Sequence, residues 1–290
     1  MIEFLLGVDG GGSGTRVVLS NPAGAILARA SAGPSALGQG VDAAWRAIEA
    51  AARDAFAQAG YVPNWSRCAL GAGLSGVNHR PWHDAFIASN PGFARLAIDS
   101  DAHTALLAAH GGQPGIMVAA GTGSVAKALY PDGSRRQIGG WGFPVGDEGS
   151  GAWLGLRAMA HTQQVMDGRA QGGALARAVQ AHCGSDHAAV QAWCAGAGQF
   201  AYAQLAPLVF SHAAHDAEAD ALLFDAATAL ECMALALDPD GRLPLALCGS
   251  IGRTLQSRMT AATRARCVAS EREAAFGALT LIRQTLENTV

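Results

Sequence analysis

The sequence predicts an α/β protein built from two similar halves. In each half apolar strands come first and alanine-rich helices follow, as expected when helices cover a sheet. Residues 4–24 and 115–134 also share one order: an apolar strand, a turn rich in Gly, Ser and Thr, a second strand and a Pro-containing turn. Few residues are identical between these passages, so the repeat is weak, but the shared order indicates two similar domains.

The composition is that of a well-packed globular chain. The 290 residues are 50% hydrophobic and 15% charged, enough for one large domain or two modest ones. A formal net charge of −3 gives no attraction to nucleic acid or to an anionic membrane. There is no run of about 18 apolar residues, and the N-terminus lacks the basic region and cleavage site of a signal peptide. We therefore expect a cytoplasmic protein with no membrane or nucleic-acid partner.

The cysteines do not have the spacing of a metal site. None of the six belongs to a C-x-x-C pair, so we expect reduced thiols, buried as small apolar residues. The histidines and acids of 182–187 and 211–220 also lack structural-zinc spacing, and we interpret these stretches as solvated helix ends or loops.

The first half is expected to begin with an antiparallel meander. Residues 3–8, 15–20 and 25–32 form apolar or β-branched runs separated by short turns, so each is predicted to be a strand. Apolar residues then recur at helical spacing from Val41, and Gly60 is placed to end that helix.

Two further strands are expected before the chain repeats. Residues 68–76 form a buried strand that runs into a glycine turn, and 95–101 form another strand followed by a helix over 102–110. The glycine-rich segment 111–115 then marks a boundary, after which the strand and turn pattern restarts. The expected domains are therefore 1–112 and 113–290.

The second half is expected to be richer in helix. Residues 149–237 are mostly helical, 243–252 form a buried strand ending in a glycine turn, and 271–286 form a terminal helix that could pack back on the first domain.

The turn Gly10–Gly14 is the first candidate ligand site. It is not a P-loop, because no Gly-Lys-Ser/Thr follows, and it is not a Rossmann turn, because a strand rather than a helix comes next. It is therefore the tip of a β-hairpin, where glycines permit positive φ and close approach, and successive N–H groups can bind an anion. An ordinary hairpin needs only one or two glycines. The tip Ala120–Ser124 in the second half is equally suited to phosphate.

These motifs carry a family resemblance. The two hairpin tips are similar to the phosphate hairpins of the sugar kinase, Hsp70 and actin superfamily. The stretch 139–155 resembles the signature of N-acetylglucosamine kinases and the related BadF/BadG/BcrA/BcrD ATPases, and 247–252 resembles an adenosine-binding turn. The resemblance covers nearly the whole chain. It implies two actin-like (ribonuclease H-like) domains, each a mixed five-stranded sheet with flanking helices, around an ATP/sugar cleft.

The resemblance also implies roles for individual residues. Asp9 would position Mg²⁺, through water, although an Asp here could equally support the turn by local hydrogen bonds. Asp101 would be the general base for the attacking sugar hydroxyl, where the alternative is a helix N-cap, and Asp99 would be structural. The implied ATP-binding residues are Gly11, Gly12, Ser13, Gly121, Thr122, Gly123, Gly249 and Ser250.

The implied sugar site draws on several loops. Its candidate residues are Ser75, Asn78, Asp101, Thr122, Trp141 and Asp147. For Asp147 and Glu148 the alternative is a favourable charge at the N-terminus of a helix that begins near Ser150. The chain departs from the family at Ala36, where an asparagine that reads the substrate is expected, and Gln39 could substitute for it.

The implied activity is ATP-dependent phosphorylation of an amino sugar. N-acetylglucosamine phosphorylated at its 6-hydroxyl is the first expectation and glucosamine is the alternative, with ATP and Mg²⁺ as cofactors and a homodimer as the usual assembly. A second class is an energy-coupling ATPase of the BadF/BcrA type, but those activators need cysteines for an iron–sulfur cluster. A sugar-sensing module without catalysis is a third, and it would have no need of a base at Asp101.

Overall fold

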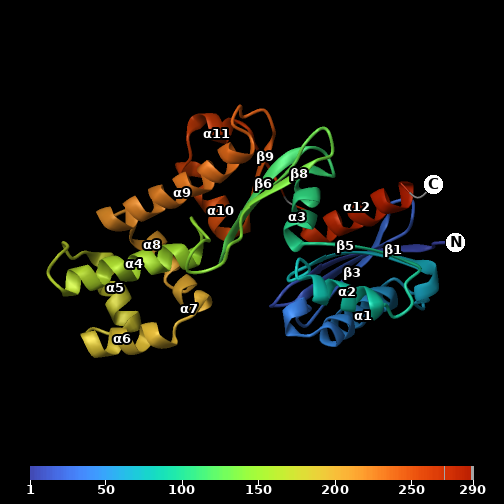
Figure 1. Cartoon of the computed structure of the whole chain (residues 1–290), viewed down its shortest axis with the longest axis horizontal. Helices are drawn as coiled ribbons and strands as arrows, with labels where there is room; N and C mark the ends of the chain where they lie inside the picture. Colours follow the sequence, from blue (N-terminus) through green and yellow to red (C-terminus); the bar gives the residue numbers. More distant parts are fainter. Residues whose placement is uncertain (271, 289–290) are drawn as a thin grey trace. The chain divides into compact units, whose positions relative to one another are not determined.

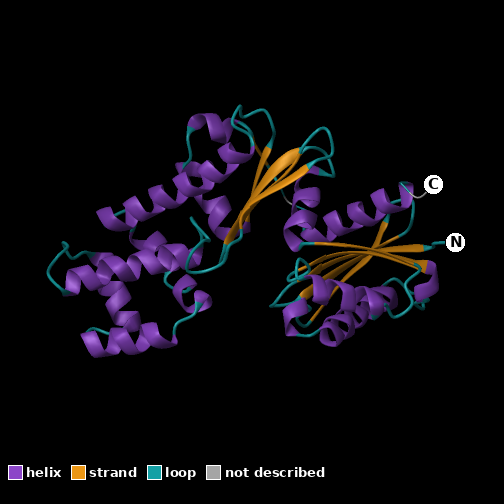
Figure 2. Ribbon diagram, in the orientation of Figure 1, coloured by secondary structure: helices purple, strands orange, loops and turns teal. Residues whose placement is uncertain are grey.

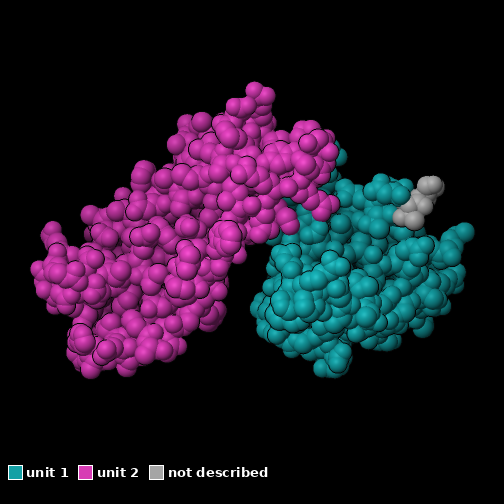
Figure 3. Space-filling view, in the orientation of Figure 1, with its two compact units in different colours: residues 1–114, 270–290 teal, residues 115–269 magenta. Residues whose placement is uncertain are grey.

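The computed structural model describes residues 1–270 and 272–288, and its chain forms two compact units (Figures 1 and 3). Unit 1 contains residues 1–114 and 270–290, and unit 2 contains residues 115–269. The C-terminal segment thus returns to the unit in which the chain begins.

Unit 1 is built on a mixed five-stranded sheet of order β3-β2-β1-β4-β5. Figure 2 shows its strands in orange, with helices in purple beside them. Its first three strands pair antiparallel and form the predicted meander, while β4 and β5 run parallel to β1. The strands are β1 (Phe4–Gly10), β2 (Thr15–Ser20), β3 (Ile26–Ala32), β4 (Cys68–Leu74) and β5 (Arg95–Asp99).

Helices cover both faces of this sheet. Leu6 and Val8 of β1 pack in one core with Trp45 and Ile48 of the helix α1, on one face. Gly7 lies on the opposite face, where a Cβ would stand 2.1 Å from the Ala275 carbonyl oxygen, so the helix there rests directly on the strand. The helices of unit 1 are α1 (Val41–Gln58), α2 (Arg80–Ala88), α3 (Asp101–His110) and α12 (Ala274–Glu287).

The predictions for unit 1 are largely confirmed. The helix from Val41 ends where expected, and Gly60 has φ +77°. The helix α2, which has a proline in its first turn, was not predicted. The terminal helix starts at Ala274, and Glu271, the first residue predicted for it, lies outside the described residues.

Unit 2 repeats the sheet of unit 1. Its order is β10-β9-β6-β7-β8, again with an antiparallel meander (β6, β7, β8) and two further strands parallel to the first. The expectation of two mixed five-stranded sheets with flanking helices is thereby confirmed. The strands are β6 (Gly115–Ala120), β7 (Ser124–Leu129), β8 (Arg135–Gly139), β9 (Leu245–Cys248) and β10 (Cys267–Val268).

Unit 2 carries the larger share of helix, as predicted for 149–237. After β9, however, the chain enters a helix directly rather than an open glycine turn, and the short α11 and β10 were not predicted. The helices are α4 (Gly151–Met166), α5 (Ala174–Cys183), α6 (His187–Gly196), α7 (Gln199–Ala203), α8 (Ala206–His212), α9 (Ala217–Leu237), α10 (Gly249–Leu255) and α11 (Ala261–Ala265). Short 3₁₀ turns occupy Leu37–Gln39, Trp65–Arg67 and Gln256–Arg258.

The cysteines are all free thiols, but the prediction that they are buried holds only in part. Cys68 and Cys183 are buried, which raises the pKa of each thiol to about 11, whereas Cys232 is exposed on α9. Within the described residues, no helix combines the length and the apolar character needed to cross a membrane.

Candidate functional site

The first glycine tip connects β1 to β2 and is closed by a hydrogen bond from Gly11 N to Gly14 O of 3.0 Å. The positive φ angles that glycines permit are not used in this tip, since no residue of 10–14 is among those with positive φ. What the glycines provide is space: a Cβ at Gly11 would have no heavy atom within 4 Å, and one at Gly12 would meet only the Gln39 amide at 3.4 Å. The outer side of the tip is therefore open to a ligand.

Backbone hydrogen bonds hold two loops beside this tip. Ser35 N donates to Gly11 O at 3.1 Å, and Ser75 N donates to Gly10 O at 3.0 Å. Leu37 N in turn donates to Ser75 O at 3.0 Å, which joins the two loops to each other. The loops that contain Ala36 and Ser75 are thus brought to the first glycine tip.

An exposed aromatic ring borders the same loops and was missed from the sequence. A Cβ at Gly38 or Gly76 would lie 3.0 or 3.2 Å from ring atoms of Trp82, so the indole packs on both glycines. His79 lies against it, with ring centroids 4.2 Å apart. An indole that remains 37% exposed can pack on the apolar face of a sugar ring. The sequence could have indicated this ring, because Trp82 lies only four residues after Asn78, a residue predicted to contact the sugar. Asn78 is itself exposed.

Gln39 also belongs to this group of residues. Its Nε2 donates to Gly12 O at 3.3 Å, so its side chain lies over the glycine tip. Its substitution for the asparagine expected at position 36 stays a prediction.

The carboxylates of unit 1 gather at one edge of the sheet. The registers pair Asp9 with Gly73 and Gly73 with Asp99, which aligns the carboxyl ends of three parallel strands. This edge is where ligands bind in open α/β sheets. Burial raises the pKa of Asp9, and the negative charges of Asp101 and Glu273 add to the effect, although Arg16, 3.4 Å away, opposes it. Asp9 and Asp101 are thus close enough for their charges to interact.

Asp101 is not the N-cap of its helix, contrary to the structural alternative raised for it. Ser100 is the N-cap and accepts from His103 N at 3.2 Å, while Asp101 is the first helical residue. From the described residues the Asp101 carboxylate accepts one hydrogen bond, from Ala102 N at 2.8 Å to Oδ1. Asp99 accepts from Ser100 N at 2.7 Å and lies 3.9 Å from His103 Nε2, which supports the structural role expected of it.

The second glycine tip rests on the start of α4. Gly121 N donates to Gly123 O at 2.9 Å, and the carbonyls of Gly121 and Thr122 accept from Gly151 N and Ala152 N at 2.8 and 3.1 Å. A Cβ at Gly121 would have no heavy atom within 4 Å, so this tip is open on its outer side, as the first is.

The buried carboxylate of Asp147 holds this tip by a hydrogen bond. It is 3% exposed and has a φ of +64°, and its Oδ1 accepts from Ser124 N at 3.1 Å while Oδ2 accepts from Gln199 Nε2 at 2.7 Å. Neither earlier interpretation anticipated these partners, and the helix N-terminus is capped by Ser150 instead. A sugar contact by Asp147 stays a prediction. Trp141, in the same loop, is 83% exposed.

A cavity of about 370 Å³ adjoins the second tip. Three of the predicted ATP-binding residues line it: Gly121, Thr122 and Ser250. Its walls are otherwise mostly apolar and include Phe200 and Phe210. Gly249 has φ +77° and a Cβ there would lie 2.2 Å from Ala120 O, so only glycine allows the chain to turn against β6 at this point.

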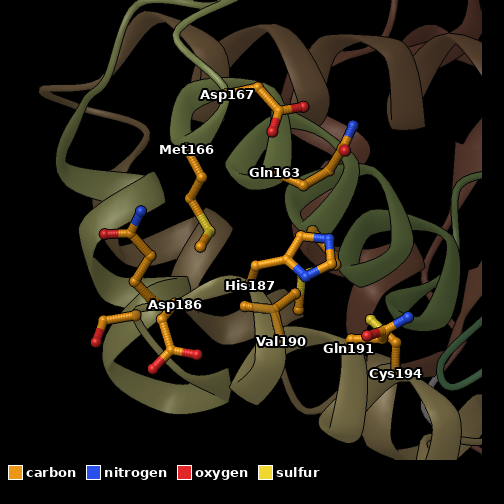
Figure 4. Close-up of a pocket in the computed structure, with 11 residues that line it drawn as sticks. Gln163, Met166, Asp167, Asp186, His187, Val190, Gln191 and Cys194 are labelled. Carbon is orange, nitrogen blue, oxygen red and sulfur yellow. The ribbon is translucent and has the colours of Figure 1, made fainter.

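A larger cavity of about 640 Å³ in unit 2 lies elsewhere and contains no predicted site residue. Figure 4 shows Gln163 and Met166 of α4 on one side of it and His187 and Val190 of α6 on another. The described residues hold no group of three or more His, Cys, Asp or Glu side chains placed to bind a metal ion.

Comparison with known proteins identifies the family. The model of the BadF/BadG/BcrA/BcrD ATPase family matches residues 6–242. The chain belongs to the BadF/BadG/BcrA/BcrD ATPase family. The match to this ATPase family includes both glycine tips, Asp9, Asp101 and Asp147, whereas Gly249 and Ser250 lie beyond it.

Several known proteins resemble this family member over most of its length. The glucosamine kinase GspK of Vibrio cholerae is 32% identical over 96% of this chain and 95% of its own. A structure from Chromobacterium violaceum, provisionally named an N-acetylglucosamine kinase, is 50% identical with a TM-score of 0.90, covering 97% of this chain and 99% of that one. A ROK hexokinase from Thermus thermophilus, 16% identical with a TM-score of 0.58, covers 98% of this chain and 99% of its own and shares the fold.

Proposed function

We propose that this protein is an ATP-dependent amino-sugar kinase that transfers the γ-phosphoryl group of ATP to the 6-hydroxyl of glucosamine. The observation that carries the proposal is the pair of glycine tips, one in each unit, whose outer sides are open at Gly11 and Gly121. The full-length similarity to a glucosamine kinase supports it.

The nucleotide would be held in three places. The backbone N–H groups of 11–13 and of 121–123 would bind phosphate oxygens, because hairpin tips without side chains let an anion approach the backbone. The cavity bordered by Phe200, Phe210 and Ser250 would take the adenine, since its mostly apolar walls suit a flat aromatic base.

The carboxylate of Asp9 is suited to positioning Mg²⁺. Its pKa is raised by burial and by the nearby charge of Asp101, so a cation there would stabilise the ionised carboxylate. Mg²⁺ prefers a few carboxylates together with water and phosphate oxygens, and would offset the charge of the transferred phosphoryl group when bound.

Asp101 would act as the general base. Its carboxylate would accept the proton of the sugar 6-hydroxyl as that oxygen bonds to the γ-phosphorus and the bond to the β-phosphate oxygen breaks, releasing ADP. The geometry supports this role because Ser100 caps the helix and the Asp101 side chain is engaged by a single described donor. Positioning and charge stabilisation would supply most of the rate enhancement.

Glucosamine is preferred over the N-acetylated sugar on two grounds. The relative from Vibrio cholerae, which is matched over 95% of its length, is named a glucosamine kinase, and Ala36 stands where the resemblance to N-acetylglucosamine kinases leads us to expect an asparagine. N-acetylglucosamine remains the second candidate because the 50% identical structure carries that provisional name. An activator ATPase is less well supported: the activator of the 2-hydroxyisocaproyl-CoA dehydratase from Clostridium difficile is 11% identical, which indicates fold alone.

A coupled ADP-release assay with glucosamine, N-acetylglucosamine, N-acetylmannosamine and glucose tests the proposal. We expect glucosamine to give the highest kcat/KM. The Asp101→Asn protein serves as the negative control for sugar-dependent ADP release. ADP release without any sugar, together with bound iron, would contradict the kinase and favour the activator ATPase, and ATP binding without turnover would favour a sugar sensor. Size-exclusion chromatography with light scattering tests the expected homodimer.

A further inference from the structure

Unit 1 has a second cavity that contains none of the residues assigned above to ATP, Mg²⁺ or sugar. Its volume is about 540 Å³, and it lies along α12, the strand β3 and the turn that precedes β3. Three arginines line it: Arg29 from β3, Arg272 just before α12 and Arg283 from α12 itself. Three guanidinium groups and one carboxylate, that of Glu273, are thus the charged groups of this cavity.

Contacts with neighbouring side chains hold Arg29 and Arg283 in place without neutralising their charge. Arg29 lies over the ring of Phe276, with its guanidinium carbon 4.9 Å from the ring centroid. Arg283 donates a single long hydrogen bond of 3.4 Å to Ser20 Oγ, and its buried Nε has no hydrogen-bond partner among the described residues. No carboxylate of a described residue forms an ion pair with Arg29, Arg272 or Arg283.

An unmatched buried donor on a charged group is costly, because the group has lost water without gaining an acceptor. An anion in the cavity would supply that acceptor. Guanidinium groups match the oxygens of phosphate with two parallel hydrogen bonds, which makes phosphate the anion that this arrangement fits best.

The rest of the cavity indicates an organic phosphate rather than the free ion. The ring of Phe276 and the side chain of Leu279 form apolar walls, and Glu273 places one carboxylate among the lining residues. A ligand with a phosphate for the arginines, a small apolar body and a hydroxyl or ammonium group for Glu273 would satisfy every part of the lining.

We propose that this cavity binds a phosphorylated polar small molecule, a phosphomonoester of the size of a sugar phosphate. The inference does not depend on the proposed kinase activity, because it concerns only the cavity on the α12 side of unit 1. Ribose 5-phosphate, a sugar phosphate that is neither the proposed substrate nor its product, is the probe of choice, with inorganic phosphate and ribose as the two halves of its chemistry.

Isothermal titration calorimetry on the full chain, with an ATP analogue, Mg²⁺ and glucosamine saturating the proposed active site, tests the proposal. We expect ribose 5-phosphate to bind at least tenfold more tightly than inorganic phosphate or ribose, and its affinity to fall as the salt concentration rises. Arg29→Gln and Arg283→Gln should each weaken this binding by tenfold or more. Arg46→Gln, which removes an exposed arginine of α1, should leave it unchanged.

Comparing the two arginine variants separates lost binding from misfolding. Arg29 is exposed on the edge strand β3, so Arg29→Gln should keep the melting temperature of the original chain even if Arg283→Gln does not. Unchanged affinity in both variants would overturn the site. Equal affinity for inorganic phosphate and the sugar phosphate would overturn the assignment to an organic ligand. Catalytic activity is not a readout, so failure of the kinase proposal would leave this result intact.

Discussion

The side chain of Gln199 donates a 2.7 Å hydrogen bond to the buried carboxylate of Asp147, and this bond ties α7 to the loop beneath the second glycine tip. The other oxygen of Asp147 accepts from the backbone N–H of Ser124, the last residue of the tip. One carboxylate therefore positions both the second glycine tip, which is proposed to bind phosphate, and a helix that borders the neighbouring cavity.

Removing this bond should destabilise the protein. Gln199→Leu takes a donor from a charged, buried acceptor, and hydrogen bonds to charged groups contribute about 1.5–3 kcal/mol. We expect a loss of about 2 kcal/mol in the free energy of unfolding from urea titration. Gln191→Leu, at an exposed position of α6, is the matched control. A double-mutant cycle with Asp147→Asn, which tolerates the positive φ, should show the two changes to be non-additive, and additivity would contradict the coupling.

Gly11→Ala should separate folding from ATP binding. The backbone there is not in the left-handed region and no heavy atom lies within 4 Å of the added methyl group, so the folded state accommodates it. Alanine reduces the freedom of the unfolded chain, and we expect a gain of about 0.4–1 kcal/mol in stability. The KM for ATP should nevertheless rise at least tenfold, because the methyl group occupies the space left for phosphate. An unchanged KM would show that the open side of this tip is not the phosphate site.

Asp101→Asn should reduce kcat by a factor of about 10² to 10⁴, the usual contribution of a general base. The KM for ATP should change little, since Asp101 is assigned no contact with the nucleotide. Steady-state kinetics with glucosamine measures both constants. Asp84→Asn, which changes an exposed carboxylate paired with Arg80, should behave like the original chain. Near-normal kcat in Asp101→Asn would remove the residue from the mechanism.

Asp9 should link stability to pH in a defined direction. Burial raises its pKa above the ordinary 3.8, so the protonated form is favoured by folding. The stabilisation is complete below pH 3.8 and is lost as the pH rises through the raised pKa. Asp9→Asn, which stays neutral, should therefore have a higher melting temperature than the original chain at pH 7, and the difference should vanish towards pH 3.8. A lower melting temperature at pH 7 would mean that the contact with Arg16 dominates.

The same variant should lose activity even where it gains stability. Removing the carboxylate removes the group proposed to position Mg²⁺, so we expect a much higher Mg²⁺ requirement in the ADP-release assay. Increased stability with reduced activity would identify Asp9 as a functional residue kept at a cost to the fold.

Phe200→Ala tests the cavity assigned to adenine. Phe200 is 70% exposed, so its removal should leave the melting temperature unchanged while the KM for ATP rises about tenfold, as expected when an aromatic contact of about 1.4 kcal/mol is lost. Phe224→Ala removes a phenylalanine that is 60% exposed on α9 and does not line the cavity. The KM of the Phe224→Ala protein for ATP should be unchanged. Equal effects of the two substitutions on this KM would mean that adenine binds outside this cavity.

Local patterns were enough to predict most of the elements. The meander, the long helix from Val41, the helical region 149–237 and the terminal helix each show a hydrophobic period or a turn signal within a few residues. These signals are local because strand and helix periodicity depends on near neighbours in the chain. The short elements β10 and α11 were missed, since two or five residues are too few to establish a period.

The sequence by itself also determined where the glycine turns and carboxylates stand along the chain, and thereby the family. Only the tertiary structure decided what each of them contacts. It showed that Asp147 is buried against Ser124 and Gln199, 23 and 52 residues away, and that Trp82 packs on Gly38 and Gly76. It also showed that Gly11 provides space rather than an unusual φ. These contacts arise when strands and loops distant in sequence are brought together by the sheet, and no periodicity in the sequence records them.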